Sequence, residues 1–221
     1  MSKRGAKYKN IFFDFDGTLF DTREGIFECL FYTLDKVKKK EVKKKVSEEL
    51  IGPPIESIFR ELFPEEDKEF LEECIKIFRK EYGKKGIFMV KQIKGLERML
   101  KKLIKGNKRL IIISNKPKIF VNKILSEFKI ENYFDCIIGT SIGQVRLSKT
   151  VVLRKTIKKL KVRKEEAVMV GDREDDILAA RENGIASLGV AYGFGSSREL
   201  IAFGADTICN SLEELGRILS V

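Results

Sequence analysis

The sequence predicts an α/β protein in which a doubly wound parallel sheet carries an inserted, all-helical second domain. Three observations lead to this fold class. Short apolar runs alternate with amphipathic helical patterns through most of the 221 residues. The runs are apolar throughout, which is typical of parallel strands that are buried on both faces. A long stretch without any strand signal interrupts this alternation after the first run.

Six apolar runs are the strand candidates. They span residues 8–15, 109–114, 135–139, 167–171, 186–191 and 206–209. The segments between them have helical periodicity, and in one of them Phe120, Ile124 and Phe128 are spaced by four. Pro117 suits the start of that helix, and Gly184 suits the C-terminal end of a later helix. Strands separated by helices favour a sheet with helices on both faces.

Residues 21–90 contain only helical patterns. Ile26, Leu30 and Leu34 form an apolar stripe at helical spacing, and a second helix is expected after the turn at Gly52-Pro53-Pro54. A crossover between parallel strands needs only about a dozen residues, so we interpret this segment as an insertion. The predicted organisation is a core formed by two segments of the chain, with a helical domain between them. Its boundaries are 1–20, 21–90 and 91–221.

The chain is basic and contains no histidine. It has 44 Lys and Arg against 33 Asp and Glu, a net charge of +11, and seven of the lysines lie in residues 36–45. Both a nucleic-acid-binding patch and a solvated helix face fit that run. The absence of a zinc-finger spacing or an RNA-binding aromatic motif favours the solvated face. Without histidine, a Ser-His-Asp triad and histidine-bound zinc are excluded, so catalysis would depend on carboxylates, lysines, hydroxyl groups or an oxygen-ligated metal.

The sequence has no feature that predicts a membrane segment. No apolar stretch approaches the roughly 20 residues that span a bilayer. The N-terminal sequence MSKRGAKYKN lacks the apolar run of a signal peptide. We therefore expect a soluble cytoplasmic protein, a monomer or a dimer, with neither a membrane nor a nucleic acid as its partner.

Polar residues follow three of the strand candidates. Asp14 and Asp16 end the first run, Ser114 and Asn115 end the second, and Asp172 follows the fourth. The carboxyl ends of parallel strands meet at one edge of the sheet, and open α/β sheets bind their ligands there. Asp14 and Asp172 are hard oxygen ligands suited to Mg²⁺. The sequence therefore predicts a site for a metal and a phosphate group at this edge.

Several of these residues also have a structural explanation. Asp172, Asp175 and Asp176 stand at the start of a predicted helix, whose dipole favours acidic side chains. Ser114 and Asn115 stand just ahead of the 117–128 helix, where they could serve as caps. A role at a helix start explains each of these residues by itself. It does not explain why they are expected at the same edge of the sheet as Asp14 and Asp16.

In their order and spacing, the motifs resemble those of the haloacid-dehalogenase superfamily. They are DxDGT at residues 14–18, the hydroxyl of Ser114, the lysine Lys149 and GDxxxD at residues 171–176. The segments DGTLFDT, IGPP, SNKP and GVAYGFGS resemble its phosphoglycolate-phosphatase-like branch. This resemblance implies a Rossmann-like core with a helical cap domain. Within GDREDD, the register before the helix favours Asp176 over an exposed Asp175 as the second acidic residue.

The resemblance also implies roles for individual residues. Asp14 would be the nucleophile that forms an aspartyl-phosphate, and Asp16 would protonate the leaving alcohol and then activate water. Lys149 would neutralise charge on the phosphate and the nucleophile, and Asp176 would orient the groups around the metal. The implied Mg²⁺ ligands are Asp14, Asp172 and the backbone carbonyl of Asp16. The implied substrate-binding residues are Thr18, Ser114, Asn115 and Lys149.

The predicted function is that of a Mg²⁺-dependent phosphatase acting on a small phosphorylated metabolite such as phosphoglycolate. A nucleoside monophosphate, pyrophosphate or a sugar phosphate is an alternative substrate, and a sugar-phosphate mutase would use the same core residues. A protein of another class, which binds anions or nucleic acids without catalysis, is a further alternative. Substrate selectivity is expected from the inserted domain, with Arg23, residues 52–54 and Arg60 as candidates.

Overall fold

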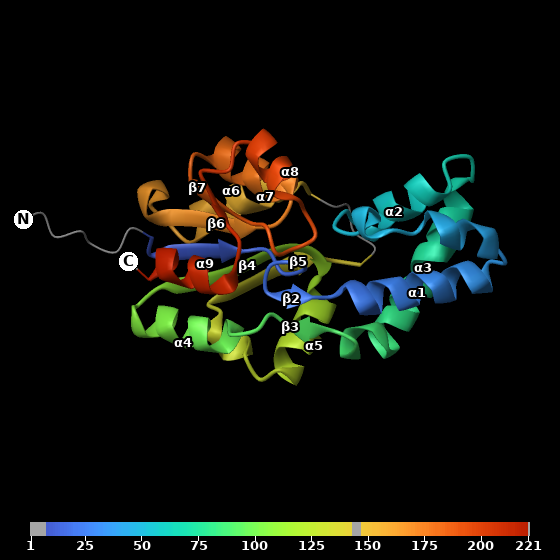
Figure 1. The fold of residues 1–221 in the computed structure, drawn as a ribbon, viewed down its shortest axis with the longest axis horizontal. Coiled ribbons are helices and arrows are strands. Elements are labelled where there is room, and N and C mark those ends of the chain that lie inside the picture. Colours follow the sequence, from blue (N-terminus) through green and yellow to red (C-terminus); the bar gives the residue numbers. More distant parts are fainter. Residues whose placement is uncertain (1–7, 143–146, 221) are drawn as a thin grey trace, which may run out of the picture. The chain divides into compact units, whose positions relative to one another are not determined.

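The computed structural model describes residues 8–142 and 147–220. Its main feature is a six-stranded parallel sheet with the strand order β5-β4-β1-β6-β7-β8 (Figure 1). The strands are β1 (Asn10–Phe13), β4 (Arg109–Pro117), β5 (Cys136–Thr140), β6 (Ala167–Gly171), β7 (Ala186–Val190) and β8 (Thr207–Cys209). They lie at the six apolar runs of the sequence, and the predicted α/β fold is confirmed.

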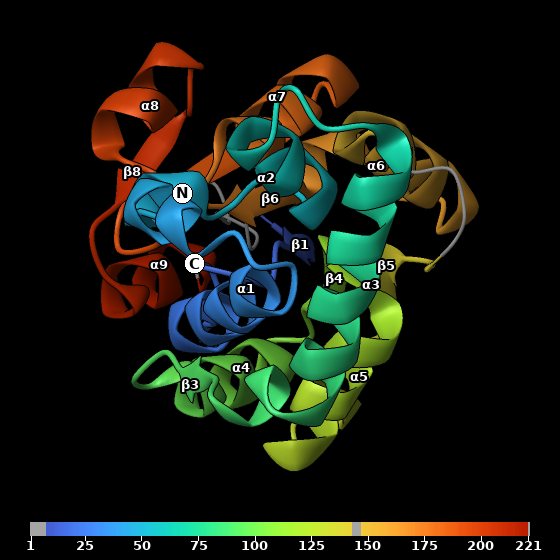
Figure 2. The same ribbon diagram turned by 90° about the vertical axis from the view of Figure 1, so that its right-hand side faces the viewer.

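Helices cover both faces of the sheet. On one face lie α6 (Lys149–Lys159), α7 (Glu174–Asn183) and α8 (Ser197–Ala202), and on the other α4 (Leu96–Lys105), α5 (Lys118–Glu127) and α9 (Leu212–Leu219) (Figures 1 and 2). Under the first group, Phe12, Ile111 and Met169 of three neighbouring strands pack against Leu153 of α6 and Ala179 of α7. This burial on both sides explains why the strands are apolar throughout. Gly184 ends α7 with a left-handed φ of 65°, as its position in the sequence predicts.

The chain divides into two compact units. The core unit consists of the residues up to Phe20 and from Gln92 onward, and the inserted unit is Asp21–Lys91. The short strands β2 (Phe20–Asp21) and β3 (Lys91–Gln92) pair with each other where the chain passes from one unit to the other. They are two residues long, which leaves no periodicity for a sequence pattern to reveal.

The inserted unit is helical. It contains α1 (Arg23–Lys36), α2 (Ile55–Leu62) and α3 (Lys68–Lys84), with the 3₁₀ turns η1 (Lys40–Lys45), η2 (Glu48–Leu50) and η3 (Gly86–Phe88). Helices α1 and α3 lie side by side (Figure 2). Asp67 caps α3 by accepting a hydrogen bond of 2.8 Å from the Phe70 N–H. Gly25 permits a close approach of α1 to η3, since a Cβ there would stand 2.2 Å from the Gly86 carbonyl oxygen.

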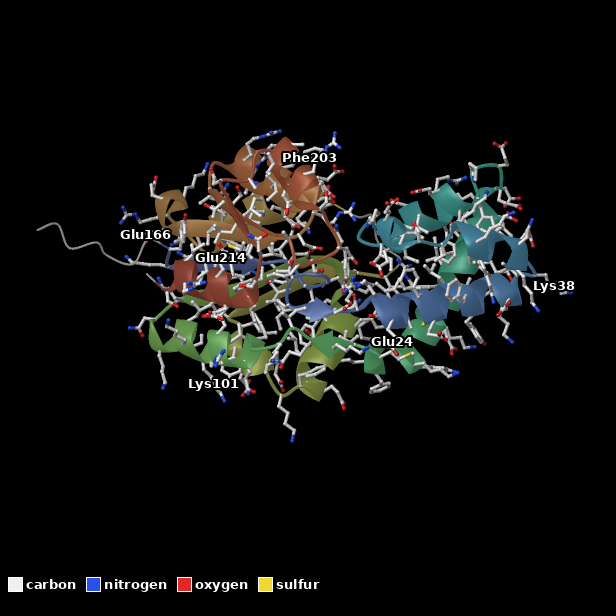
Figure 3. All side chains as sticks on the ribbon, in the orientation of Figure 1. Glu24, Lys38, Lys101, Glu166, Phe203 and Glu214 are labelled. Atoms are coloured by element: carbon white, nitrogen blue, oxygen red, sulfur yellow. The ribbon has the colours of Figure 1, made fainter. Side chains whose placement is uncertain are left out.

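Most charged side chains stand on the outer side of the helices, as Figure 3 shows for Glu24 of α1 and Lys101 of α4. The lysine run begins at the end of α1 and continues through η1, where Lys43 pairs with Asp35 at 2.7 Å. No helix in the described part of the chain is long and apolar enough to cross a membrane.

Candidate active site

The polar residues singled out in the sequence meet at the carboxyl edge of the sheet. They come from four places in the core unit: the loop after β1, the end of β4, the start of α6 and the loop after β6. Of the described acidic side chains, Asp14, Asp172 and Asp176 form a cluster in which one carboxylate oxygen of each lies within 4.8 Å of those of the other two. All three are buried.

A tight turn after β1 places Asp14 and Asp16. The Asp14 N–H donates to the Val170 carbonyl at 2.8 Å, so Asp14 continues the register of β1 against β6. The chain then reverses, because the N–H groups of Leu19 and Phe20 both donate to the Phe15 carbonyl. Gly17 takes a φ of 74° within this turn, a conformation that favours glycine. Strand geometry alone would point the two carboxylates to the same side, and the turn redirects the second one.

The three buried carboxylates disfavour their own ionisation. Burial raises the pKa of Asp14, and it raises the pKa of Asp172 to about 8 and that of Asp176 to about 7. The negative charge of Asp14 adds to the upward shift of both Asp172 and Asp176. Such a cluster binds either protons or a cation.

Lys149 supplies a positive charge to this cluster. Its Nζ lies 2.6 Å from Asp176 Oδ1 and 3.2 Å from Asp14 Oδ2, and the side chain is almost fully buried. Burial opposes its charge, but the Asp14 and Asp176 carboxylates outweigh it and raise the pKa of Lys149 above its usual range. Lys149 is the first residue of α6, after Ser148, whose side chain caps the helix. The lysine therefore stays charged at any physiological pH.

Asp172 is fixed by hydrogen bonds to both of its oxygens. The Thr18 hydroxyl donates to Oδ1 at 3.1 Å, and the Phe194 N–H donates to Oδ2 at 2.7 Å. The Tyr192 hydroxyl in turn donates to the Thr18 carbonyl at 3.1 Å. Thr18 is fully buried, so the structure places its hydroxyl on Asp172, and its implied contact with substrate stays a prediction.

Glycines let the backbone close around Asp172. A Cβ at Gly17 would stand 2.1 Å from Asp172 Oδ2, and one at Gly193 would stand 2.4 Å from Asp172 Cβ. A Cβ at Gly195 would stand 1.9 Å from the Asp172 carbonyl oxygen. No side chain fits at these distances, so Gly193 and Gly195 of the segment GVAYGFGS have a steric reason.

The end of β4 differs from the sequence expectation. The strand continues to Pro117 and α5 begins only at Lys118, because a residue before proline is held in an extended conformation. Ser114 and Asn115 therefore lie within the strand and do not cap the helix, whose N-cap residue is Pro117. The Ser114 hydroxyl instead accepts a hydrogen bond from the Lys116 N–H at 3.2 Å.

Lys116 also lies at this edge of the sheet, and no pattern in the sequence predicts a role for it. Its buried side chain reaches across to the loop after β1, where Nζ donates to Asp16 Oδ1 at 2.9 Å. The only signal for it in the sequence is its place directly after Ser114 and Asn115. The sequence pattern does not single out Tyr192 or Phe194 either, although both lie in the segment GVAYGFGS.

The two acidic candidates of α7 are distinguished by the structure. Asp176 is fully buried and accepts hydrogen bonds from Lys149 Nζ and, at 3.1 Å, from the Arg173 N–H. Asp175 is exposed and accepts a hydrogen bond of 3.3 Å from Asn115 Nδ2. Asp176 thus faces the cluster, as the register before the helix predicts, and it also caps the first turn of α7.

The residues present fit a divalent metal ion. Asp14 Oδ1 is buried without a hydrogen-bond partner among the described residues, so this oxygen is unsatisfied. Within the described part of the chain, the site has four carboxylates, those of Asp14, Asp16, Asp172 and Asp176, and the ion pairs there involve two lysines, Lys116 and Lys149. A hard divalent cation would balance this charge, and an all-oxygen donor set is the one that Mg²⁺ prefers.

The chain is similar to known proteins of one hydrolase family. Residues 11–190 match the haloacid dehalogenase-like hydrolase family. A 5'-nucleotidase of Pseudomonas aeruginosa is 30% identical over 99% of both chains. A phosphoglycolate phosphatase of Colwellia psychrerythraea is 26% identical over 93% of this chain and 94% of its own. The crystal structure of a predicted phosphatase from Clostridium acetobutylicum superimposes with a TM-score of 0.87 at 35% identity, covering 97% of this chain and 99% of that one.

Proposed function

We propose that this chain, which belongs to the haloacid dehalogenase-like hydrolase family and is a phosphatase, hydrolyses small phosphate monoesters with Mg²⁺ through an aspartyl-phosphate on Asp14. The observation that carries the proposal is the position of Asp14. One of its oxygens is paired with Lys149 at 3.2 Å, and the other is buried and has no hydrogen-bond partner among the residues that the structure describes. This second oxygen is available to a metal ion or to a phosphorus atom.

In the first step Asp14 attacks phosphorus, and the ester oxygen leaves. The bond from Asp14 to phosphorus forms as the bond to the leaving oxygen breaks, so a carboxylate nucleophile divides the hydrolysis into two displacements. Lys149 holds the Asp14 carboxylate in place and offsets the charge of the phosphoryl oxygens. A bound Mg²⁺ would supply further positive charge, with Asp14, Asp172 and the Asp16 carbonyl as its protein ligands.

Asp16 is the group proposed to move protons. It protonates the leaving alcohol in the first step and takes a proton from the attacking water in the second. Its side chain keeps 21% of its surface exposed, more than any of the three clustered carboxylates, and so it is open to a substrate. Ser114 and the Asn115 N–H are proposed to bind the phosphate oxygens. Asp176 is proposed to orient Lys149, to which it is bonded at 2.6 Å.

We assign the choice among phosphate monoesters to the inserted unit. The two arginine candidates make contacts within that unit. Arg23 pairs with Asp21 at 2.7 Å and with Glu48 at 3.4 Å, and Arg60 donates to the Glu66 carbonyl at 3.0 Å. These contacts suffice to explain both arginines structurally, so their role in selectivity remains a proposal.

The experiment that tests the proposed function is an assay of the purified protein with para-nitrophenyl phosphate. We expect hydrolysis with Mg²⁺, its loss with EDTA and its return when Mg²⁺ is restored. A panel of phosphorylated metabolites, ranked by kcat/KM, would then identify the preferred ester. A protein that folds and binds Mg²⁺ but hydrolyses none of these esters would contradict the proposal.

A further inference from the structure

The sequence pattern Ser-x-x-Glu occurs at the start of both α8 and α9. It spans residues 196–199 and 211–214. In both helices the serine is the N-cap residue, and its side chain accepts a hydrogen bond from the N–H of the glutamate. The pattern is typical of a capping box, in which the glutamate side chain turns back to an N–H at the start of its own helix. It predicts the same role for Glu199 and Glu214.

The two glutamate side chains have different partners in the structure. Glu214 Oε2 accepts a hydrogen bond of 2.8 Å from the Asn210 N–H, just ahead of its own helix. Glu199 Oε1 instead accepts two hydrogen bonds, each 2.9 Å long, from Arg173 Nε and from the Glu174 N–H. These donors lie between β6 and the first turn of α7. A capping box therefore explains the side chain of Glu214 but not that of Glu199.

The segment that Glu199 contacts connects two of the clustered carboxylates. Asp172 directly precedes it, and the Arg173 N–H donates to Asp176 Oδ2 at 3.1 Å. Asp176 is in turn bonded to Lys149 Nζ at 2.6 Å. A shift of the backbone at residues 173–174 would therefore move the Asp172 and Asp176 carboxylates relative to each other.

We propose that Glu199 is a positioning residue for Asp172 and Asp176, which fixes residues 173–174 so that the carboxylate cluster is ordered before a divalent cation binds. This inference rests on the proposed function, because it takes the cluster as the Mg²⁺ site. Glu199 would act through the backbone of this segment.

The chemistry of the contact supports a positioning role. A single carboxylate oxygen holds both a guanidinium group and a backbone N–H, and hydrogen bonds to an ionised acceptor are stronger than those between neutral groups. The side chains of Arg173 and Glu199 are 21% and 20% exposed, so water screens this pair less than a fully exposed one. A segment held in this way need not be ordered when the cation binds, which favours tighter binding.

The test is a calorimetric titration of the purified protein with Mg²⁺. Glu199→Met removes the acceptor and keeps an unbranched side chain, and the Kd for Mg²⁺ should rise by about 10- to 100-fold, as is usual when a group that orients metal ligands is lost. Glu199→Gln keeps an acceptor oxygen, so its affinity should lie between those of the wild type and Glu199→Met.

A kinetic measurement separates metal binding from the reaction itself. With para-nitrophenyl phosphate, the Mg²⁺ concentration that gives half-maximal activity should rise in Glu199→Met by the same factor as the Kd. At saturating Mg²⁺ its kcat should approach that of the wild type, because the residues proposed to carry the reaction are unchanged. A lower kcat at saturating Mg²⁺ with an unchanged Kd would contradict a role in ordering the cluster.

Glu214→Met is the matched control, because it removes the other glutamate of the same pattern. It loses the hydrogen bond at the start of α9 and should lower the midpoint of thermal unfolding, but it should bind Mg²⁺ like the wild type. If Glu199→Met does not fold, Glu199→Asp takes its place. Its carboxylate is one methylene shorter and cannot hold both donors, so Mg²⁺ binding should again weaken.

The possible failures are distinguishable. Wild-type Mg²⁺ affinity in a folded Glu199→Met or Glu199→Asp would overturn the inference and leave the proposed function intact. An equal loss of affinity in Glu214→Met would show that Mg²⁺ binding follows general stability, and it would also overturn the inference. A wild-type protein that binds no Mg²⁺ would contradict the proposed function as well.

Discussion

The two units of the molecule differ in how far they bury their charged side chains. The core unit buries five charged side chains at the carboxyl edge of its sheet: Asp14, Lys116, Lys149, Asp172 and Asp176. Among the described residues of the inserted unit, only Glu81 is a buried charged residue. Two of its exposed ion pairs, Lys39 with Glu66 and Lys43 with Asp35, keep a third or more of their side-chain surface in solvent.

Charged residues therefore have two uses in this molecule, one in a buried site and the other on a solvated surface. Burying a charge costs free energy unless it is paired, and a buried carboxylate cluster is tolerated where chemistry requires it. Exposed pairs contribute little to stability and keep a helical surface solvated. The following predictions test whether this division of the molecule holds.

The largest effect is expected for Asp14→Asn. The amide is nearly isosteric but cannot attack phosphorus, so kcat should fall by about 10⁴-fold or more. Covalent phosphate should be trapped on the wild type and be absent from the variant. Asp175→Asn, which changes an exposed acid near the same edge, is the matched control and should remain active. Covalent label retained by Asp14→Asn would place the nucleophile elsewhere.

The next effect concerns Asp16→Asn, which removes the proposed proton donor. We expect kcat for alkyl esters to fall by about 10²–10⁴-fold. The loss should be much smaller for para-nitrophenyl phosphate, because nitrophenolate leaves without protonation. An equal loss for both kinds of ester would argue against Asp16 as the general acid.

Thr18→Val tests the fixation of Asp172. The substitution removes the hydroxyl that donates to Asp172 Oδ1 at 3.1 Å and preserves the volume of the side chain. Titration calorimetry should show Mg²⁺ binding weakened by about 10- to 100-fold, the usual effect of losing a group that orients a metal ligand. Thr156→Val, at another buried threonine, should bind Mg²⁺ like the wild type. Unchanged affinity in Thr18→Val would mean that Asp172 needs no such support.

The buried carboxylates also predict a pH dependence of stability. The folded-state pKa values of Asp172 and Asp176, about 8 and about 7, lie above the unfolded value of about 3.9. Between these limits the folded protein holds protons that the unfolded chain releases. The metal-free protein should therefore become less stable as the pH rises from 5 to 8, by up to about 1.4 kcal/mol per pH unit for each proton that the unfolded chain releases.

Mg²⁺ should replace those protons, so the stabilisation that it provides should grow over the same pH range. Urea unfolding at pH 5, 6.5 and 8, with EDTA or with saturating Mg²⁺, measures both effects. A metal-free protein that becomes more stable towards pH 8 would show that the cluster is not protonated in the folded state.

The smallest effect is expected for Lys43→Met in the inserted unit. Its pair with Asp35 is exposed, so the midpoint of thermal unfolding should shift by less than about 2 °C. The same substitution at Lys149 is the matched comparison and should shift the midpoint by much more, because it leaves two buried carboxylates without their lysine. Similar shifts for the two variants would remove the distinction between the units.

The positions of the strands were predictable because each one is buried on both faces and so carries a continuous apolar run. The meeting of Asp14, Ser114 and Asp172 at one edge followed from the parallel order of those strands. The ion pair between Lys116 and Asp16 was not predictable. It joins residues 100 positions apart, and a lysine is unremarkable in so basic a chain.

The loop around Asp172 was also beyond the sequence pattern. Gly193 and Gly195 are small because the Asp172 side chain and backbone lie against them, a reason that only the folded structure reveals. The extension of β4 to Pro117 could have been anticipated from the effect of proline on its neighbour. The helix start was expected at Pro117, and in the structure Pro117 is the N-cap residue of α5.

The place of β1 in the sheet has a consequence for how the chain acquires its structure during synthesis. This central strand pairs Asn10 with Arg109 on one side and with Ala167 on the other. The strand that positions Asp14 is therefore synthesised before β4 and β6, and it cannot pair with them until those strands have been synthesised. Residues 21–91 are contiguous, so they can fold as soon as they emerge. The helical unit should form early and fast, and the catalytic edge should form last, in a slower step governed by distant strand pairing.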